Sequence, residues 1–344
     1  MPPDPTGKAR IAFAFLGCGA ITRRHSARLR AYRDVSRFHA SREKGRADTM
    51  NRELGGAGAF GTYQAALADP RVTCAVVATP PSTHLALTLA ALANGKDVVV
   101  EKPAFLHSGD VDTVRDAAAA AGRMVLVGEN YHYKPLAIML RQIVESGDLG
   151  EVRFVHVNAL KRQDAPGWRD DTALAGGGAL FEGGIHWMHL MANLGLPVLR
   201  VRGHRPDAAP DRVERSMLAV FDYAGGAVGT LSHSWEIAAP LGGVRTSAIF
   251  GTEGAVHFES NGLILRLRGR RSRLRTPGLR DFLGFNAMWR DFVGALSERR
   301  PAAMTLAHAR EDLALVEAAY ETAAADARGV AVRTSAVGGS SPSA

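Results

Sequence analysis

The first 130 residues alternate short β-rich apolar runs with helical stretches, and this alternation constrains the fold more than any other feature of the chain. The runs expected to form strands include "RIAFAFLG", "VSRFHAS", "TCAVVAT", "DVVVEKP" and "MVLVGEN". Parallel strands are joined by crossover helices, so the alternation is typical of a doubly wound α/β sheet. We expect six strands in the layout of a Rossmann dinucleotide-binding domain.

The pattern changes after about residue 129. One helical segment, "PLAIMLRQIVESG", precedes the long strand-like run "EVRFVHVNAL", a glycine-rich helical segment and a series of strands joined by glycine-bearing turns. This series predicts an α+β domain whose sheet is open and largely antiparallel. The later strands are expected over residues 197–206, 213–223, 227–237, 244–250, 254–259 and 262–268, and two helices follow them.

We therefore expect two domains and a tail. Residues 1–129 form a Rossmann NAD(P)-binding domain, residues 130–333 an α+β substrate-binding and oligomerisation domain, and residues 334–344 a disordered tail. A broad sheet with helices on one face needs a partner for its other face. The expected assembly is thus a homodimer or a homotetramer.

The composition limits where such a chain works. The chain has 344 residues, 46% hydrophobic and 22% charged, which suffices for two packed cores. No apolar run approaches the roughly 20 residues that span a bilayer, so we expect a cytoplasmic protein with no membrane partner. Cys18 and Cys74 have no partner at metal or redox spacing, which fits a reducing compartment.

The formal net charge of +8 indicates anionic ligands. The arginines are mostly dispersed, without aromatic residues interleaved at regular spacing, which argues against a nucleic-acid partner. Small acidic or phosphate-bearing ligands are favoured. The arginine-rich segment 266–280 is interpreted as the solvated face of an edge strand with its loop, with an anion or partner patch as the less favoured alternative.

A glycine-rich turn follows the first expected strand and opens a helix. In "LGCGAITRRH" the backbone of Gly17, Gly19, Ala20 and Ile21 is expected to approach a pyrophosphate at the helix N-terminus. Thr22 departs from the small residue usual at the third position of this motif. An ordinary strand-to-helix turn is the alternative, and the surrounding alternation of strands and helices argues against it.

The end of the second strand bears on which cofactor is bound. NAD-binding domains usually place an acidic side chain there, whereas "FHASREKGRA" offers Ser41, Arg42 and Lys44. These residues favour the 2′-phosphate of NADP(H), with NAD(H) as an alternative cofactor. If Arg42 stacks over the adenine, Glu43 is expected to point elsewhere. A loop in which all these side chains are solvated is the other interpretation.

Two further segments end strands at the edge where open α/β sheets bind ligands. "ATPPSTH" is expected to line the nicotinamide pocket with Thr79, Pro80 and His84. "VVVEKPAF" places Glu101 and Lys102 at the end of the fifth strand. A lysine there can polarise a carbonyl oxygen or hold a substrate hydroxyl.

The segment "GGGALFEGGIHWMH" carries Glu182, His186 and His189 at spacings of four and three. Helical spacing puts all three on one face, which suits a metal site, an acid–base cluster or an ordinary core helix. Carboxylate and imidazole groups are good zinc ligands, but a neighbouring lysine repels a cation. We expect no metal here.

Several motifs together resemble those of the Gfo/Idh/MocA oxidoreductases, a family that includes glucose-fructose oxidoreductase and inositol 2-dehydrogenase. The matching segments, between Ile11 and Arg333, are "GCGAITRRH", "ATPPSTH", "EKP", "NYHYKP", "SGDLGEV", "GGGALFEGGIH" and "DFVGALSERRP". The resemblance implies hydride transfer between a nicotinamide cofactor and a carbon of a sugar, cyclitol or related carbinol. It further implies that Lys102 and His186 handle the proton.

Three positions depart from the family pattern. Glu182 and His189 stand where the family usually has aspartates, and His132 stands where an arginine is often found. These departures bear on the substrate more than on the chemistry. We interpret Glu182 and His186 as catalytic or substrate-binding residues, and His189 as a hydrogen-bonded core residue.

Aromatic and basic residues elsewhere are candidates for sugar contacts. In "DAPGWRDD", Trp168 is expected to stack on a sugar ring and Arg169 to hold a hydroxyl or carboxylate, unless the aromatic ring only fills the domain interface. Tyr131 and His132 follow the sixth strand and are expected to reach the same cleft. Their alternative role is to cap the helix that links the domains.

The favoured function is an NADP-dependent oxidoreductase that acts on a sugar-like hydroxyl or ketone. Reduction of an imine or a tetrapyrrole is an alternative, and Lys102 with His186 argues for carbinol chemistry instead. A regulator that binds the cofactor without catalysis is the second alternative, because Glu182 and His189 are altered.

Overall fold

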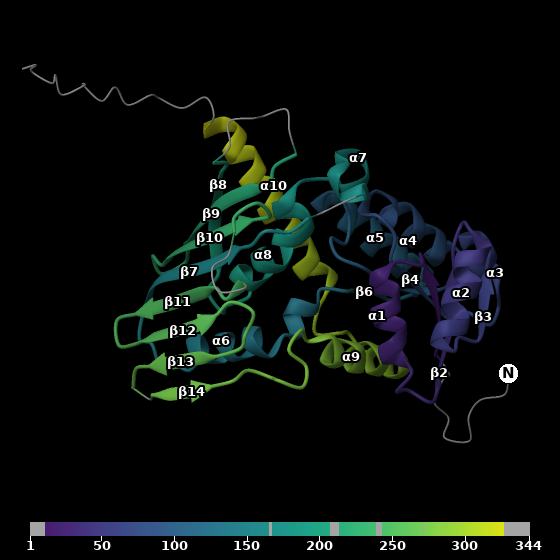
Figure 1. Ribbon diagram of the computed structural model, residues 1–344, viewed down its shortest axis with the longest axis horizontal. Helices are drawn as coiled ribbons and strands as arrows, with labels where there is room; N and C mark the ends of the chain where they lie inside the picture. Colours follow the sequence, from purple (N-terminus) through teal and green to yellow (C-terminus); the bar gives the residue numbers. More distant parts are fainter. Residues whose placement is uncertain (1–10, 165–166, 207–212, 239–242, 271, 327–344) are drawn as a thin grey trace, which may run out of the picture.

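The computed structural model describes residues 11–164, 167–206, 213–238, 243–270 and 272–326. Two sheets lie side by side, one from the N-terminal part of the chain and one from the C-terminal part (Figure 1). The predicted disordered tail, residues 334–344, lies outside the described residues.

The N-terminal sheet, called the Rossmann sheet below, has six parallel strands in the order β3-β2-β1-β4-β5-β6. This order confirms the predicted doubly wound fold. Its strands are β1 (Ile11–Leu16), β2 (Val35–Ala40), β3 (Gly58–Phe60), β4 (Cys74–Val77), β5 (Asp97–Val100) and β6 (Val125–Val127). Its helices are α1 (Ala20–Leu29), α2 (Lys44–Leu54), α3 (Tyr63–Ala68), α4 (His84–Ala93) and α5 (Ser108–Ala121). The strand order reverses between β1 and β4, the place where such sheets bind ligands.

The C-terminal sheet, called the open sheet below, has eight strands in the order β14-β13-β12-β11-β7-β10-β9-β8. The pairs are antiparallel except β7 with β10, so the predicted open, largely antiparallel sheet is confirmed. The strands are β7 (Val152–Leu160), β8 (Val198–His204), β9 (Ser216–Tyr223), β10 (Val228–Ser234), β11 (Thr246–Gly251), β12 (Ala255–Glu259), β13 (Leu265–Arg268) and β14 (Arg273–Arg275).

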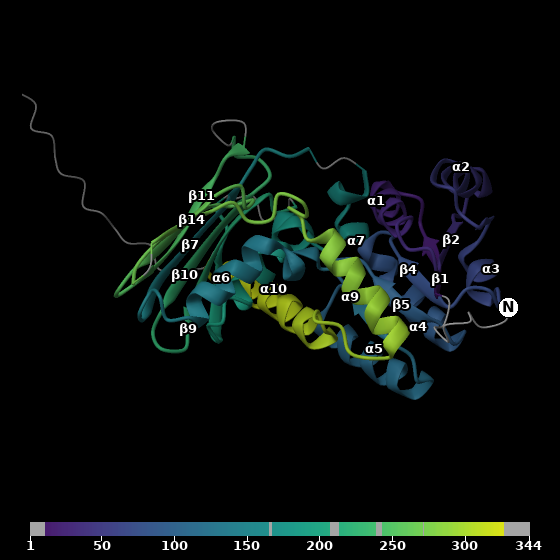
Figure 2. The ribbon, with the colours of Figure 1, turned by 90° about the horizontal axis from the view of Figure 1, so that it is seen from below.

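Helices lie between the two sheets. Figure 2 shows α6 (Pro135–Glu145) and α10 (Leu306–Asp326) on the inner face of the open sheet, and no described helix on its outer face. The glycine-rich segment forms a π-helical turn, Leu180–Gly184, which continues into α8 (Ile185–Ala192). Short helical turns also occur at Pro81–Thr83, Asn130–Tyr133 and Gly167–Asp170, together with α7 (Thr172–Ala175).

The chain returns to the Rossmann sheet near its end. On α9 (Phe285–Glu298), Trp289 is fully buried, lies edge-on to Phe13 of β1 and donates a hydrogen bond from Nε1 to His25 Nδ1 at 2.8 Å. Helix α10 packs against both α5 and β8. The two sheets therefore share one continuous apolar core. None of the described helices is both long and apolar enough to cross a membrane.

Candidate active site

A cavity of about 600 Å³ opens at the carboxyl edge of the Rossmann sheet. It is lined partly by the turns after β1, β2, β4 and β5, and partly by the segment from Lys161 to His186. Most of the predicted site residues line it: Gly17, Gly19, Ala20, Ile21, Ser41, Arg42, Thr79, Pro80, Glu101, Lys102, Tyr131, Trp168, Arg169, Glu182 and His186.

The turn before α1 is shaped for close approach of an anion. Gly17 has a φ of +105°, and a Cβ there would lie 2.6 Å from the carbonyl oxygen of Ala78. A Cβ on Gly19 would meet nothing within 4 Å, so space is open in front of the helix. The first turn of α1 carries no acidic side chain and no side-chain cap. Its backbone N–H groups therefore suit the pyrophosphate of a dinucleotide.

Thr22 explains the departure from the glycine-rich pattern. Its hydroxyl is fully buried and donates to the carbonyl oxygen of Gly17 at 2.7 Å. The side chain at this third position thus ties the turn to the helix, so a threonine is accommodated without loss of the turn.

Positively and negatively charged side chains both line the cavity just after β2. Arg42 and Arg46 line it, and so does Glu43, whose Oε1 lies 3.4 Å from Arg46 Nη1. Glu43 therefore lines the cavity, unlike the orientation expected if Arg42 stacks over the adenine. Ser41 is nearly buried, and its Oγ accepts a hydrogen bond from the Glu43 backbone N at 3.2 Å.

Two residues predicted to bind the cofactor do not line the cavity. Lys44 Nζ lies 2.8 Å from both carboxylate oxygens of Asp48, because residues four apart on a helix face each other. His84 is buried, and its ring lies 3.0 Å from the Pro103 carbonyl oxygen and 2.9 Å from that of Thr79. His84 therefore links the loop after β4 to the loop after β5 by hydrogen bonds.

His186 is held in a defined orientation at the cavity wall. Its Nδ1 lies 2.7 and 2.9 Å from the two carboxylate oxygens of Glu129, a buried residue just after β6. A carboxylate can only accept, so Nδ1 carries the proton and Nε2 keeps its lone pair. The ring also stacks on Tyr131, with centroids 4.5 Å apart.

Burial and charge set the protonation of this pair. Burial lowers the pKa of His186 below its ordinary value, although the Glu129 carboxylate partly opposes that shift. Burial alone would raise the pKa of Glu129, but the charge and hydrogen bond of His186 outweigh it and lower that pKa to about 2. At neutral pH the pair is thus a neutral imidazole beside a carboxylate.

Lys102 reaches the π-helical turn across the cavity. Its Nζ donates to the Glu182 carbonyl oxygen at 2.8 Å and lies 3.5 Å from Glu182 Oε1. Arg169 Nε donates to the same Oε1 at 3.1 Å. Although burial raises the pKa of Glu182, Lys102 and Arg169 lower it to about 2, so the carboxylate stays ionised. The peptide bond between Lys102 and Pro103 is cis.

Glu101 connects the cavity to helix α9. Its Oε1 contacts His25 Nε2, and His25 Nδ1 accepts the hydrogen bond from Trp289. The indole can only donate, so the His25 proton lies on Nε2, facing Glu101. Through His25, Trp289 on α9 thereby helps to orient the Glu101 carboxylate beside the predicted nicotinamide pocket.

His132 and His189, two of the departures from the family pattern, contact each other. His132 Nδ1 lies 3.1 Å from His189 Nε2, and His189 Nδ1 lies 2.8 Å from Asp312 Oδ2. Both histidines are buried and neither lines the cavity. The predicted substrate contact by His132 is therefore wrong, whereas His189 is the hydrogen-bonded core residue expected. Among the described residues, no group of three His, Cys, Asp or Glu side chains is arranged to hold a metal ion.

Sequence reasoning missed Glu129 and Lys161. Both lie at the carboxyl ends of strands, after β6 and β7 respectively, and Lys161 lines the cavity. The rule that ligands gather at the ends of parallel strands flags Glu129. No comparable rule covers Lys161, because its strand belongs to the mixed sheet.

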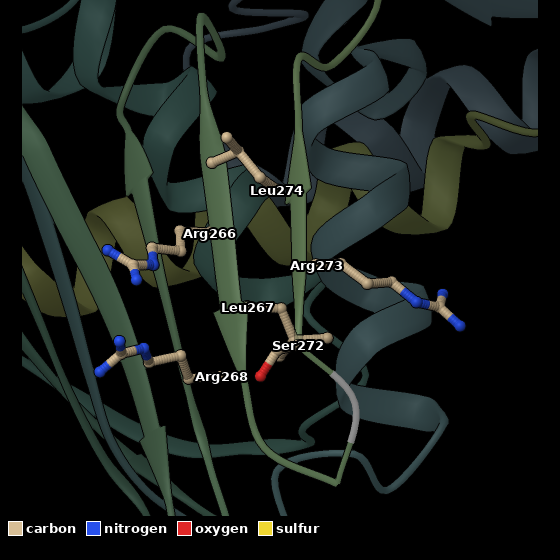
Figure 3. A pocket seen from close by; sticks show the side chains of 6 residues that line it. All are labelled: Arg266, Leu267, Arg268, Ser272, Arg273 and Leu274. Carbon is tan, nitrogen blue, oxygen red and sulfur yellow. The ribbon is translucent and has the colours of Figure 1, made fainter.

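Part of the arginine-rich segment forms the hairpin β13–β14 at the margin of the open sheet (Figure 1), and none of its described arginines lines the cavity. Figure 3 shows Arg266 and Arg268 directed to one side of the hairpin and Arg273 to the other. On β13 the exposed arginines alternate with buried Leu265 and Leu267. The solvated arginine face expected of one strand is found on β13. Residues 273–275, expected to be loop, instead form the edge strand β14, with Arg273 on the other side.

Family models match both parts of the chain. Residues 11–129 match the oxidoreductase family with an NAD-binding Rossmann fold, and residues 138–257 match the GFO/IDH/MocA C-terminal domain. The D-xylose 1-dehydrogenase (NADP(+)) 2 of Haloferax volcanii is 30% identical over 57% of this chain and 61% of its own length. The D-glucoside 3-dehydrogenase of Escherichia coli is 30% identical over 45% of each chain.

Solved structures share the fold over nearly the whole chain. The aldose-aldose oxidoreductase from Caulobacter crescentus, complexed with glycerol, superposes with a TM-score of 0.81 at 23% identity, covering 92% of this chain and 98% of that one. GenD2 from gentamicin A biosynthesis, in complex with NAD, gives 0.79 at 28% identity, covering 92% and 94%. The two family models together cover more than half of the chain, which therefore belongs to the Gfo/Idh/MocA family of NAD(P)-binding oxidoreductases.

Proposed function

We propose that this oxidoreductase is an NADP-preferring dehydrogenase of sugar-like hydroxyls in which His186 takes the hydroxyl proton. One observation carries the proposal: Glu129 holds Nδ1 of His186, which leaves Nε2 as a base beside Lys102 at the cavity wall. Relatives named as xylose and glucoside dehydrogenases support carbinol chemistry.

The residues at the cavity wall have different roles in the proposed oxidation. A nicotinamide cofactor, when bound, would supply the acceptor for the hydride that leaves the carbinol carbon. The hydroxyl proton passes to Nε2 of His186, the carbonyl double bond forms, and the imidazolium is stabilised by Glu129 until the proton reaches water. The Lys102 ammonium stabilises negative charge developing on the oxygen, and Glu182 fixes that ammonium in place. Ketone reduction follows the same steps in reverse.

Replacing Lys102 or His186 by alanine tests these roles. We expect Lys102→Ala and His186→Ala each to lower turnover of xylose or a glucoside by about two orders of magnitude or more, because each removes a group that acts on the transferred proton or the alkoxide. Cofactor dissociation constants, measured by fluorescence, should change little. Near-normal turnover in both variants would contradict the proposal.

The preference for NADP is proposed from the turn after β2. Arg42 and Arg46 line the cavity there, and Ser41 lies beside them. Guanidinium groups bind phosphate through charge-assisted hydrogen bonds worth about 1.5–3 kcal/mol each, about a tenfold to hundredfold preference. The Glu43 carboxylate repels the 2′-phosphate, so the attraction by the two arginines must exceed that repulsion.

Dissociation constants for NADPH and NADH test the preference. The wild type is expected to bind NADPH at least about tenfold more tightly, for the same electrostatic reason. The double variant Ser41→Asp/Arg42→Ile should lose this preference, because it adds a carboxylate and removes a guanidinium. Equal affinities in the wild type, or a double variant that still prefers NADPH, would refute the assignment.

The parts of the chain before and after the boundary at Glu129 are proposed to bind different molecules. Residues 1–129 hold the cofactor and residues 130–333 hold the substrate and the assembly contact, a division supported by the family matches to residues 11–129 and 138–257. The uncovered face of the open sheet supports a homodimer or homotetramer, since Phe154 and Leu199 are exposed by 51% and 71%.

A further inference from the structure

The substrate end of the cavity carries more cationic than anionic side chains. Lys102, Lys161 and Arg169 line it, while Glu182 and Glu101 are the carboxylates nearby. Lys102 and Arg169 both contact Glu182, and Glu101 is paired with His25. One carboxylate is thus shared between two cations, and the third cation is left uncompensated.

Lys161 is that third cation. Among the described residues, its ammonium has no hydrogen-bond or ion-pair partner, although its side chain lies at the cavity wall. Its backbone is fixed, because its N–H donates to the Ser234 carbonyl oxygen at 3.1 Å and it directly follows β7. The sheet therefore fixes the backbone from which this side chain reaches the cavity wall.

The other charged groups around Lys161 do not neutralise it. Burial and the nearby Arg245 lower the pKa of Lys161, and Glu182 opposes them. Glu182, the carboxylate that acts on Lys161, is already in contact with Lys102 and Arg169. A partly buried ammonium without a partner is costly, and an anionic ligand removes that cost.

Arg169 offers a second group to the same ligand. Its Nε is engaged by Glu182, but its terminal nitrogens have no partner among the described residues. The guanidinium lies over the Trp168 ring, 4.5 Å from the centroid, which limits its movement. The planar end of a guanidinium matches two oxygens of a carboxylate or a phosphate.

We infer that the substrate carries an oxyanion, either a carboxylate or a phosphate ester, which Lys161 and Arg169 bind while His186 acts on the carbinol. This inference rests on the proposed dehydrogenase function and names its substrate class: an acidic sugar derivative. A neutral sugar leaves Lys161 without a partner, so it is expected to be a poorer substrate by about tenfold to hundredfold.

Steady-state kinetics with matched sugars test this. The substrates are glucuronate and gluconate for the carboxylate, glucose 6-phosphate for the phosphate, and glucose and xylose as neutral compounds. For the wild type, we expect kcat/KM for at least one acidic compound to exceed that for glucose by about tenfold or more. Lys161→Met should lower kcat/KM for that acidic compound by about tenfold or more, a clearly larger loss than for glucose or xylose.

Two control variants separate charge from packing. Lys161→Arg keeps the charge and should retain the preference for the acidic compound. Arg268→Met removes an exposed cation on β13, outside the cavity, and should change neither class of substrate. Added NaCl should raise KM for the acidic compound and not for glucose, because salt screens the attraction.

Equilibrium binding to the cofactor-loaded enzyme distinguishes this inference from the proposed function. Calorimetry with the same compounds reports affinity without turnover. If the acidic compounds bind tightly, lose that affinity in Lys161→Met, and none is oxidised or reduced, the oxyanion site stands and the proposed dehydrogenase function is contradicted. Turnover and binding that favour glucose or xylose, or equal losses for all sugars in Lys161→Met, would overturn the inference and keep the dehydrogenase. Failure of every acidic compound to bind more tightly than glucose would overturn it too.

Discussion

Glu129 makes His186 a base with a fixed tautomer. The imidazole proton on Nδ1 points to a buried carboxylate, so the lone pair on Nε2 points to the cavity. The same carboxylate stabilises the imidazolium that forms when the proton arrives. Glu129 acts through His186 and is therefore a positioning residue.

We expect Glu129→Gln to lower kcat by about tenfold to hundredfold and to shift its pH profile. The base must be neutral, so oxidation slows as pH falls through the pKa of His186, which burial places below its ordinary value. Glu129 raises that pKa in part, so its removal should move the acid limb to lower pH. A kcat–pH profile of both proteins measures this.

Glu321→Gln serves as the control for that variant, since Glu321 is exposed on α10. Its profile should match the wild type. A lower plateau in Glu129→Gln with an unmoved acid limb would show that Glu129 is merely structural.

The site was predictable wherever a motif fixed both the position and the direction of a side chain. Lys102, Glu182 and His186 were all expected, and all line one cavity. Lys44 and His84 were misplaced because position along a strand end does not tell which way a side chain turns. One faces a carboxylate four residues away, and the other faces backbone carbonyl groups.

At the scale of elements, the turn between β1 and α1 allows a direct test. Gly17→Ala brings a Cβ 2.6 Å from a backbone oxygen at a φ of +105°, so the turn must shift. We expect a loss of about 1–3 kcal/mol in the free energy of unfolding and weaker cofactor binding. Urea unfolding and cofactor titration measure both effects.

Gly19→Ala is the matched control. Gly19 has a φ of −89°, and an added Cβ meets nothing within 4 Å. Its stability should equal that of the wild type, although the methyl group enters the space meant for a pyrophosphate. If both variants lose equal stability, the argument from Gly17 sterics is wrong.

Most helices and strands could be predicted from the pattern of apolar residues in the sequence. The strands of the Rossmann sheet that have long apolar runs were predicted, and so were two helices after the last strands, which are α9 and α10. β3 and β14 are only three residues each and carry little pattern of their own, so no range was assigned to them. Their existence depends on pairing with β2 and β13, a tertiary effect.

At the scale of the whole molecule, the uncovered face of the open sheet predicts assembly. Phe154 lies near its middle on β7, stacked beside His156 and paired in register with Phe250. We expect a dimer or tetramer by light scattering at micromolar concentration, because apolar surface on such a sheet is stabilised by a second copy. Phe154→Asp should shift the protein toward monomer.

Phe154→Leu preserves the apolar contact and should leave the assembly intact. A wild type that is monomeric at micromolar concentration would contradict the expectation. So would a Phe154→Asp variant whose mass is unchanged.

Helix α9, which packs on the Rossmann sheet, is synthesised long after the strands of that sheet. A ribosome completes β6 at Val127 but reaches Trp289 roughly 160 residues later, about 10–30 seconds at typical rates of synthesis. Until then Phe13 has no indole beside it, and His25 lacks the donor that directs it toward Glu101. The Rossmann sheet is therefore synthesised well before the helix that packs against Phe13. A nascent chain stalled before α9 carries the glycine-rich turn but lacks the Trp289 hydrogen bond that orients His25 toward Glu101.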